Sequence, residues 1–213
     1  MKTIALFGAS GQTGRPFLPL ALQAGYRVVA LVRDPAKITE RHPNLEIVAG
    51  DILDPAAVAE TCRTADVVVS LIGHVKGSPA FVQTDGTQHI LNALRSRGAG
   101  QVKIISLTGG AVPYPAKDQP KLPDRIFKFI MGIVAADVLA DAIRHAQVLQ
   151  ASGQPAVIVR GPRLTNDARR GQYRVGWVGV NASTKIARAD LADFLLTQVE
   201  SDEFVGQMPF VSY

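Results

Sequence analysis

A glycine-rich turn near the start of the chain constrains its fold more than any other feature. Four apolar residues, Ile4–Phe7, precede glycines at positions 8, 11 and 14, which form the pattern G-x-x-G-x-x-G. This arrangement predicts a short buried strand, a tight turn and the start of a helix. Gly8 permits the sharp turn, Gly11 lets an anion approach the backbone, and Gly14 lets the helix pack closely on a sheet. Because the free N–H groups at a helix start bind anions, we expect this turn to hold the diphosphate of a dinucleotide.

The length and composition of the chain fit a single α/β domain. Its 213 residues, 47% of them apolar, suffice to bury a substantial core. Cys62 is the one cysteine, which excludes an intramolecular disulfide and fits the reducing cytoplasm, where we expect the protein to act. The longest apolar region, 126–140, is interrupted by Lys128 and Asp137, so we expect no membrane span and no membrane partner.

The charge and the histidines argue against two further kinds of site. The net charge of +5 comes from dispersed basic residues, of which only Arg169 and Arg170 are adjacent. Because no basic stripe is interleaved with aromatic residues, we expect a basic surface around an anionic cofactor and no nucleic-acid partner. The four histidines show no metal-ligand spacing, so we expect no metal site.

Apolar runs and helical segments alternate along the rest of the chain. Strands are predicted at 26–33, 45–49, 67–72, 102–107, 156–160, 184–188 and 207–211, and helices at 12–24, 82–97, 124–152 and 190–200, with short helices beginning at Asp34 and Asp54. This alternation predicts a Rossmann-type, doubly wound and mainly parallel α/β sheet with helices on both faces. We expect one domain, 1–213, with a kink at Pro19, a bend at Gly132 and a small substrate-covering region at 161–183.

The end of the second predicted strand distinguishes between dinucleotides. NAD-binding proteins carry an acidic residue there, which accepts hydrogen bonds from the adenosine ribose. Here Arg33 follows the strand, and its guanidinium group can bind the 2′-phosphate of NADP; a solvated strand end is the alternative. Asp34 fits the cap of the short helix that begins at Pro35. We therefore predict NADP(H) as the cofactor. Asp51 either accepts a hydrogen bond from the adenine amino group or is a residue of a turn.

These motifs, together with Gly50-Asp51 and Asp85-Gly86-Thr87, resemble those of the atypical short-chain dehydrogenases. Within that group the chain is most similar to the NADPH-dependent flavin reductases, also called biliverdin reductase B, and to NmrA-like NAD(P)H-binding proteins. The similarity extends into the C-terminal half through 148–153 and 201–204. It implies a doubly wound fold and direct hydride transfer from NADPH to flavins, quinones or linear tetrapyrroles.

The glycine motif and this resemblance together place the cofactor against the turns that follow the predicted strands. The expected cofactor-binding residues are Gly8, Ser10, Gly11, Gln12, Thr13, Gly14, Arg33, Asp51, Ile52, Leu71, Ile72, Gly73, Leu107, Thr108 and Pro162. At the reaction centre the chain departs from the family, because the Thr-Ser pair of flavin reductase is Thr108-Gly109 here and Arg163 replaces a histidine. The missing serine weakens the case for tetrapyrrole reduction and leaves cofactor binding untouched.

Two residues are candidates for a catalytic role. Thr108 can hydrogen-bond the nicotinamide carboxamide or the acceptor. The alternative is that its hydroxyl hydrogen-bonds a backbone group at the end of the strand. Carbonyl-reducing relatives use Y-x-x-x-K, but Tyr114-Pro115-Ala116-Lys117 is one residue short and contains proline, so we expect Tyr114 to line the pocket from a loop. His74 follows the fourth predicted strand, near the expected nicotinamide ribose, and we interpret it as a solvent-facing loop residue.

The weak acid–base equipment selects a class of acceptor. A ketone is hard to reduce without an acid, whereas a flavin or quinone forms a delocalised anion that takes its proton from water. We therefore predict an NADPH-dependent reductase of a small planar acceptor, such as a flavin or a quinone, that is a monomer or a weak homodimer. The alternative is an NmrA-like NADP(H) sensor without turnover. Phe127 and 129–131 fit core packing best, with a pocket wall or a dimer seam as alternatives.

Overall fold

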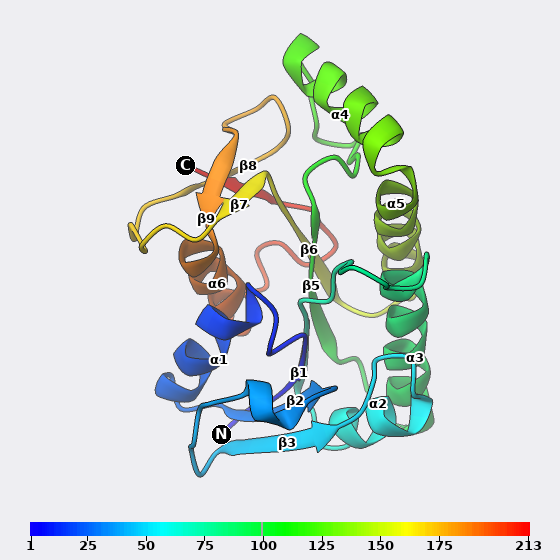
Figure 1. The fold of residues 1–213 in the computed structure, drawn as a ribbon, viewed down its shortest axis with the longest axis vertical. Coiled ribbons are helices and arrows are strands. Elements are labelled where there is room, and N and C mark those ends of the chain that lie inside the picture. The colour runs from blue at the N-terminus through cyan, green and yellow to red at the C-terminus, as the bar shows by residue number, and fades with distance from the viewer. Residues whose placement is uncertain (99) are drawn as a thin grey trace.

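In the computed structural model, which describes residues 1–98 and 100–213 apart from the side chain of Phe127, strands and helices alternate along the chain (Figure 1). The strands are β1 Thr3–Phe7, β2 Arg27–Val32, β3 Leu45–Ala49, β4 Val67–Ser70, β5 Lys103–Gly109, β6 Ala156–Gly161, β7 Arg163–Thr165, β8 Arg174–Gly176, β9 Lys185–Ala187 and β10 Phe210–Ser212. The helices are α1 Gly14–Gln23, α2 Pro55–Cys62, α3 Val82–Ser96, α4 Leu122–Val134, α5 Ala136–Ala151 and α6 Arg188–Thr197, with a 3₁₀ turn at Pro35–Lys37.

The central sheet has the strand order β3-β2-β1-β4-β5-β6-β10-β8. Every neighbouring pair is parallel except β10 and β8, which pair antiparallel at one edge. The chain moves outward in one direction from β1 to β3 and in the other from β4 onward, so the switch point lies between β1 and β4. A doubly wound sheet binds its ligands in the crevice at that point, beyond the carboxyl ends of the strands. The predicted fold class is confirmed.

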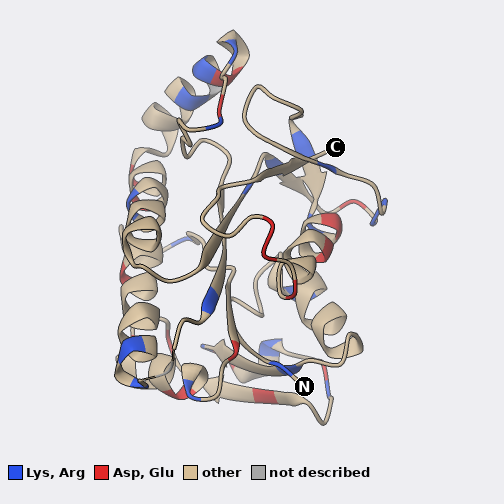
Figure 2. Ribbon diagram, turned by 180° about the vertical axis from the view of Figure 1, so that it is seen from behind, with Lys and Arg blue, Asp and Glu red and all other residues tan. Residues whose placement is uncertain are grey.

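Helices cover both faces of the sheet and bury its apolar strands. Helices α1 and α6 lie on one face, and α2, α3 and α5 lie on the other (Figure 1). Within β1, Ile4 and Leu6 pack in the cluster beneath α1 and α6, while Ala5 and Phe7 pack in the cluster beneath the other three helices. This alternation follows from the two-residue repeat of a strand, and burial on both faces explains the continuous apolar run in the sequence. Most of the charged residues lie on helices and loops (Figure 2).

Two local expectations need correction. The long helix predicted over 124–152 does not bend at Gly132; it divides at Ala135, where φ is −140° and ψ is 46°. Strand β9 does not join the central sheet but pairs in parallel with β7. Helix α1 contains Pro19 within its bounds, and the kink there stays a prediction. The segment 161–183 holds β7 and β8, and none of the described helices is long and apolar enough to span a bilayer.

A buried ion pair ties the loop after β5 to the sheet. Arg160 of β6 is fully buried, and its two terminal nitrogens lie 2.7 and 2.8 Å from the two carboxylate oxygens of Asp118. The same guanidinium group donates to the carbonyl oxygens of Met208 and Val112, each at 2.9 Å. All of these acceptors come from loops that converge on β6, so the guanidinium group holds them together.

We predict that Asp118→Ala lowers the free energy of unfolding by about 3–5 kcal/mol, because it leaves the Arg160 cation buried without a counter-charge. Urea unfolding followed by circular dichroism measures the change. The control is Glu60→Ala, which breaks the exposed pair with Arg63 and should change stability by less than about 1 kcal/mol. Similar effects of the two substitutions would contradict the role given to Asp118.

Candidate functional site

The turn between β1 and α1 leaves no room for side chains at its glycines. Gly8 has a φ of +87°, and a Cβ built on it would lie 2.8 Å from the carbonyl oxygen of Leu71. At Gly14, the first residue of α1, a Cβ would lie 2.1 Å from the carbonyl oxygen of Gly8. Gly11 donates its N–H to that same oxygen at 3.0 Å. The turn is therefore a bare backbone cradle at a helix N-terminus, which suits a diphosphate group.

A cleft of about 800 Å³ begins at this turn and lies over the carboxyl ends of the central strands. Its walls contain every residue that the sequence assigned to the cofactor except Gly14, which is buried behind the turn. These residues are Gly8, Ser10, Gly11, Gln12, Thr13, Arg33, Asp51, Ile52, Leu71, Ile72, Gly73, Leu107, Thr108 and Pro162. Residues from six different turns thus meet in one crevice at the switch point of the sheet.

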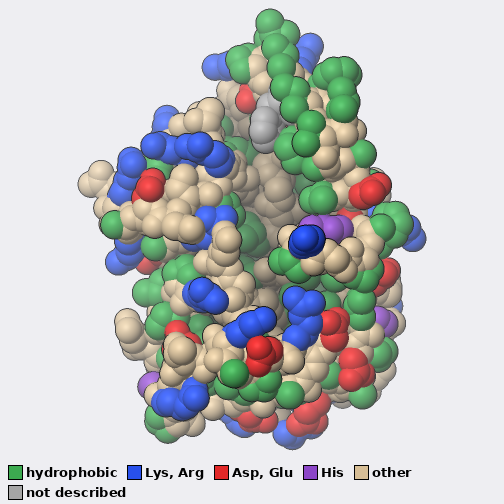
Figure 3. Space-filling view, in the orientation of Figure 1, with side chains coloured by type: hydrophobic (Ala, Val, Ile, Leu, Met, Phe, Trp, Pro, Cys, Tyr) green, Lys and Arg blue, Asp and Glu red, His purple; other side chains and the backbone are tan. Residues whose placement is uncertain are grey.

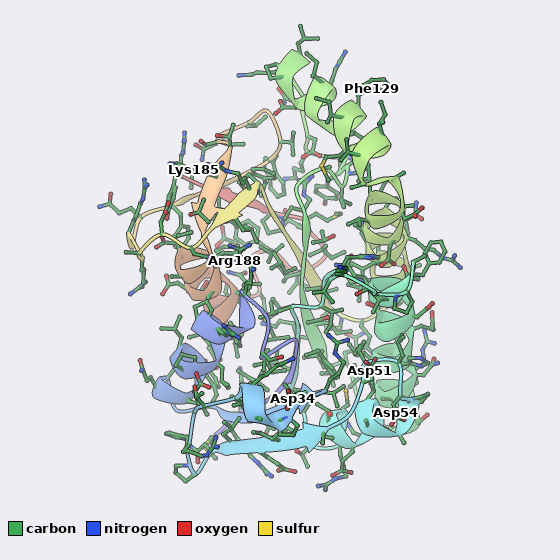
Figure 4. The ribbon with its side chains drawn as sticks, in the orientation of Figure 1. Asp34, Asp51, Asp54, Phe129, Lys185 and Arg188 are labelled. Carbon is green, nitrogen blue, oxygen red and sulfur yellow. The ribbon has the colours of Figure 1, made fainter. Side chains whose placement is uncertain are left out.

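At one end of the cleft, Arg33 is exposed while the carboxylates around it are engaged. Asp34 accepts the N–H of Ala36 at 3.1 Å and so caps the 3₁₀ turn, as the sequence predicts. Asp51 accepts the N–H of Leu53 at 2.9 Å, and its second oxygen lies 3.9 Å from the Arg33 guanidinium group. Figure 4 shows both aspartates beside the strand ends that carry them. Arg33 is therefore the residue at this end that can bind a 2′-phosphate.

At the other end, two buried polar atoms have no hydrogen-bond partner among the described residues. These are the hydroxyl of Thr108 and the side-chain carbonyl oxygen of Gln83, both in the cleft wall. The amide nitrogen of Gln83 is engaged, since it donates to the carbonyl oxygen of Ile72 at 2.8 Å. A Cβ built on Gly109 would meet nothing within 4 Å, so the position after Thr108 has room for a side chain. Buried polar atoms are nearly always paired, and a carboxamide, which both donates and accepts, would satisfy these two.

His74 also lies in the cleft wall, which corrects the interpretation of a solvent-facing residue. Its side chain is 14% exposed, and its Nε2 lies 2.7 Å from the buried carboxylate of Asp141 in α5. Asp141 also accepts the N–H groups of Gln83 and Thr84 at 2.9 Å and the Thr84 hydroxyl at 2.6 Å. Burial raises the pKa of Asp141, but these hydrogen bonds outweigh it and hold the pKa below its usual value. No local sequence signal joins residues 74 and 141.

A second histidine, His145, lies behind the cleft in a closed polar chain. Its two ring nitrogens lie 2.7 Å from the Thr87 hydroxyl and 2.8 Å from the Ser106 hydroxyl. Burial lowers the pKa of His145 to about 4, because the charged imidazolium would lose its hydration. The ring is therefore neutral near pH 7 and links α3, α5 and β5 beneath the site.

A second cavity, of about 930 Å³, adjoins the cleft, and Pro162 lines both. The space-filling view shows the molecule hollowed between α4 and the strands β7 and β9 (Figure 3). Apolar side chains dominate the wall, and cationic side chains stand at its edge. The apolar set includes Val112, Pro113, Pro115, Phe129, Ile133, Leu139, Val178 and Phe210, and the cationic set is Arg125, Lys128 and Arg163.

Tyr114 lines neither cavity, although both of its proline neighbours line the second. Its N–H donates to Asp118 at 2.7 Å, and its ring packs 5.7 Å from the ring of Trp177 and 5.7 Å from the Arg160 guanidinium group. The loop wraps around the buried ion pair and turns the phenol away from the cavity. Lys117 lies over the Trp177 ring, so no tyrosine–lysine pair is assembled in the cleft.

Some apolar residues of helix α4 line the two cavities, and others lie exposed on the surface. Met131 lines the coenzyme-sized cleft, whereas Phe129 is 70% exposed at the edge of the second cavity, and Ile130 is exposed. Core packing of these residues, as expected from the sequence, is therefore wrong; the side chain of Phe127 lies outside the described part of the chain.

Comparison with known proteins identifies the family. A family model described as NAD(P)H-binding matches residues 8–202, beginning at the first glycine of the turn. The chain belongs to this NAD(P)H-binding family. The bare backbone of the glycine cradle suits the diphosphate of such a cofactor, and the two unpaired polar atoms of the cleft suit its polar groups.

Relatives of this NAD(P)H-binding protein include reductases. It is 26% identical to reductase pytE of Aspergillus terreus over 99% of its own length and 98% of the reductase. Two solved structures share its fold at a TM-score of 0.77. One is a wide-type short-chain dehydrogenase/reductase of Veillonella parvula in complex with NADP, which is 16% identical, with 100% of this chain and 94% of that one covered. The other is ChuY, an anaerobillin reductase of Escherichia coli O157:H7, which is 19% identical, with 100% and 97% covered.

Some curated relatives are longer, and the chain spans 62% of one and 12% of another. The family match and the full-length reductase relative agree at a coarse level. The protein is an NAD(P)H-binding protein built on a Rossmann-type sheet.

We predict that Arg33→Gln weakens NADPH binding about ten- to a hundredfold and leaves NADH binding unchanged, because only NADPH carries a 2′-phosphate. Isothermal titration calorimetry with both cofactors measures the two dissociation constants. Lys37→Gln removes a nearby exposed cation outside the cleft and serves as the control. Equal losses for NADPH and NADH would remove Arg33 from the phosphate site.

We predict that His145 lowers the free energy of unfolding as the pH falls from about 6.5 to about 4. Its pKa is lower in the folded chain than in the unfolded chain, so the unfolded state binds more protons in this window, and acidification favours unfolding by up to about 3 kcal/mol. Urea unfolding at a series of pH values should show a smaller loss for His145→Gln. His89→Gln is the control, and an unchanged slope in His145→Gln would contradict the assignment.

Proposed function

We propose that the protein transfers a hydride from NADPH to a flavin, a quinone or a similar planar acceptor bound in the 930 Å³ cavity. The observation that carries this proposal is the junction of that cavity with the coenzyme cleft at Pro162, next to the expected nicotinamide position. Its volume lies in the range that holds ligands of this size. The reductase names of pytE and ChuY support redox turnover over binding alone.

The walls of the cavity suit an apolar ring that carries an acidic group. Phe129, Ile133 and Phe210 offer apolar surface for the ring, and Arg125, Lys128 and Arg163 offer positive charge to a carboxylate or phosphate. The bound coenzyme supplies the hydride from C4 of its nicotinamide ring. The role of the protein is to hold the acceptor about 3–3.5 Å from that carbon.

The inward position of Tyr114 also favours this class of acceptor. Hydride addition to a flavin or quinone gives a delocalised anion, which takes its proton from water without a positioned acid. One hydride from NADPH and one proton from solvent then give the reduced acceptor and NADP⁺. A ketone would form a localised alkoxide and need the tyrosine–lysine pair that the loop does not provide.

The test follows NADPH absorbance with FMN and with a simple quinone, in the wild type and in two variants at Gly132. This residue lines the cavity from α4, and a Cβ built on it meets nothing within 4 Å. We expect saturable oxidation in the wild type. Gly132→Phe should raise KM for the acceptor about tenfold or more with an unchanged Kd for NADPH, whereas Gly132→Ala should resemble the wild type.

Two outcomes would overturn the proposal. If NADPH binds tightly but no acceptor is reduced, the protein is the NmrA-like sensor of NADP(H) that the sequence left as the alternative. If acceptors are reduced but Gly132→Phe has no effect on KM, the acceptor does not bind in this cavity.

A further inference from the structure

Arg188 enters the coenzyme cleft from the side opposite Arg33. It is the first residue of α6, directly after β9, and it lines the same cleft as the glycine turn. Figure 4 shows it next to the turn between β1 and α1, and α6 packs against α1. One terminal nitrogen of Arg188 donates to the carbonyl oxygen of Leu164 at 3.1 Å and to the side-chain oxygen of Asn166 at 2.7 Å. These two acceptors therefore hold the guanidinium group from the side of β7. Its other N–H groups remain available to a ligand.

Both of these acceptors are neutral, and no carboxylate among the described residues lies within 4.0 Å of Arg188. Other arginines of the chain differ: Arg160 is paired with Asp118, and Arg169 is paired with Asp193. Partial burial lowers the pKa of Arg188, since the cation loses hydration and no negative charge compensates. A half-buried cation in a ligand cleft without a counter-charge is complementary to an anionic ligand.

The order of the strands indicates which part of the cofactor this cation faces. Arg33 follows β2, on one side of the switch point between β1 and β4, whereas Arg188 follows β9, whose partner β7 continues from β6 on the other side. A dinucleotide extends across such a switch point, with its adenosine on the first side and its nicotinamide on the second. The anionic group of the nicotinamide half is its own 5′-phosphate. We propose that Arg188 binds this phosphate of the diphosphate, next to the N-terminus of α1.

Three ligands separate the two arginines by binding alone. NAD⁺ has the nicotinamide-side phosphate and no 2′-phosphate, 2′,5′-ADP has the 2′-phosphate and lacks the nicotinamide half, and NADP⁺ has both groups. We expect Arg188→Gln to weaken NAD⁺ and NADP⁺ about ten- to a hundredfold and to leave 2′,5′-ADP unchanged. Arg33→Gln should show the reverse pattern, with NADP⁺ and 2′,5′-ADP weakened and NAD⁺ unchanged.

Calorimetry on the full chain measures all twelve dissociation constants, for the wild type and three variants, with Lys185→Gln as the third variant. Lys185 is a cation of β9, three residues before Arg188, and lines neither cavity, so its loss should change none of the three affinities. A salt series adds a readout that a packing role would not move. Raising the salt concentration should weaken NAD⁺ binding less in Arg188→Gln than in the wild type, because one screened charge contact is already gone.

The proposal fails if Arg188→Gln leaves NAD⁺ binding unchanged, since the cation then serves the acceptor or the surface. It also fails if the variant weakens 2′,5′-ADP as much as NAD⁺, or keeps the salt dependence of the wild type, since the substitution then disturbs the cleft as a whole. All of these readouts are equilibrium affinities. They therefore stand apart from the proposed acceptor chemistry, which can fail while Arg188 still binds the phosphate.

Discussion

The close crossing of α1 over β1 is the constraint on which the site depends. The space between Gly14 and the carbonyl oxygen of Gly8 admits no additional carbon atom, and Gly8 itself is held against the backbone at Leu71. A larger residue at either position would push α1 away from the sheet, and α6 rests on α1. The position of the cradle and the position of Arg188 at the start of α6 therefore follow from the same contact.

Fully satisfied polar groups fix the opposite wall. Asp141, His145 and Arg160 are buried, and burial of such groups is unfavourable unless every hydrogen-bonding atom has a partner. Their partners come from other elements, so each group locks two or more segments in one arrangement. Asp141 aligns the start of α3 with His74, and Arg160 holds the loop after β5. The cleft thus has a glycine wall set by close backbone packing and a polar wall set by hydrogen bonds.

The sequence predicts best the structural features that depend on residues close together along the chain. Strands β1, β2, β4 and β6 are largely apolar runs, the glycine turn is a local motif, and the caps at Asp34 and Asp54 form within two residues of each aspartate. The errors concern residues whose partners are distant along the chain. His74 is withdrawn from solvent by Asp141, and the direction of Tyr114 depends on Arg160. The helix divides at Ala135 because α5 is anchored to α3, whereas α4 rises over a cavity, which no pattern within 124–152 can reveal.

The empty space at Gly109 has a consequence for how such sites diversify. The backbone there already follows β5, and a side chain could be added without moving any neighbour. The flavin reductases that this chain resembles carry a serine at the matching position. Exchange of Gly109 for serine would therefore add a hydroxyl to the cleft on an unchanged backbone, and selection can move between the two residues without a loss of foldability.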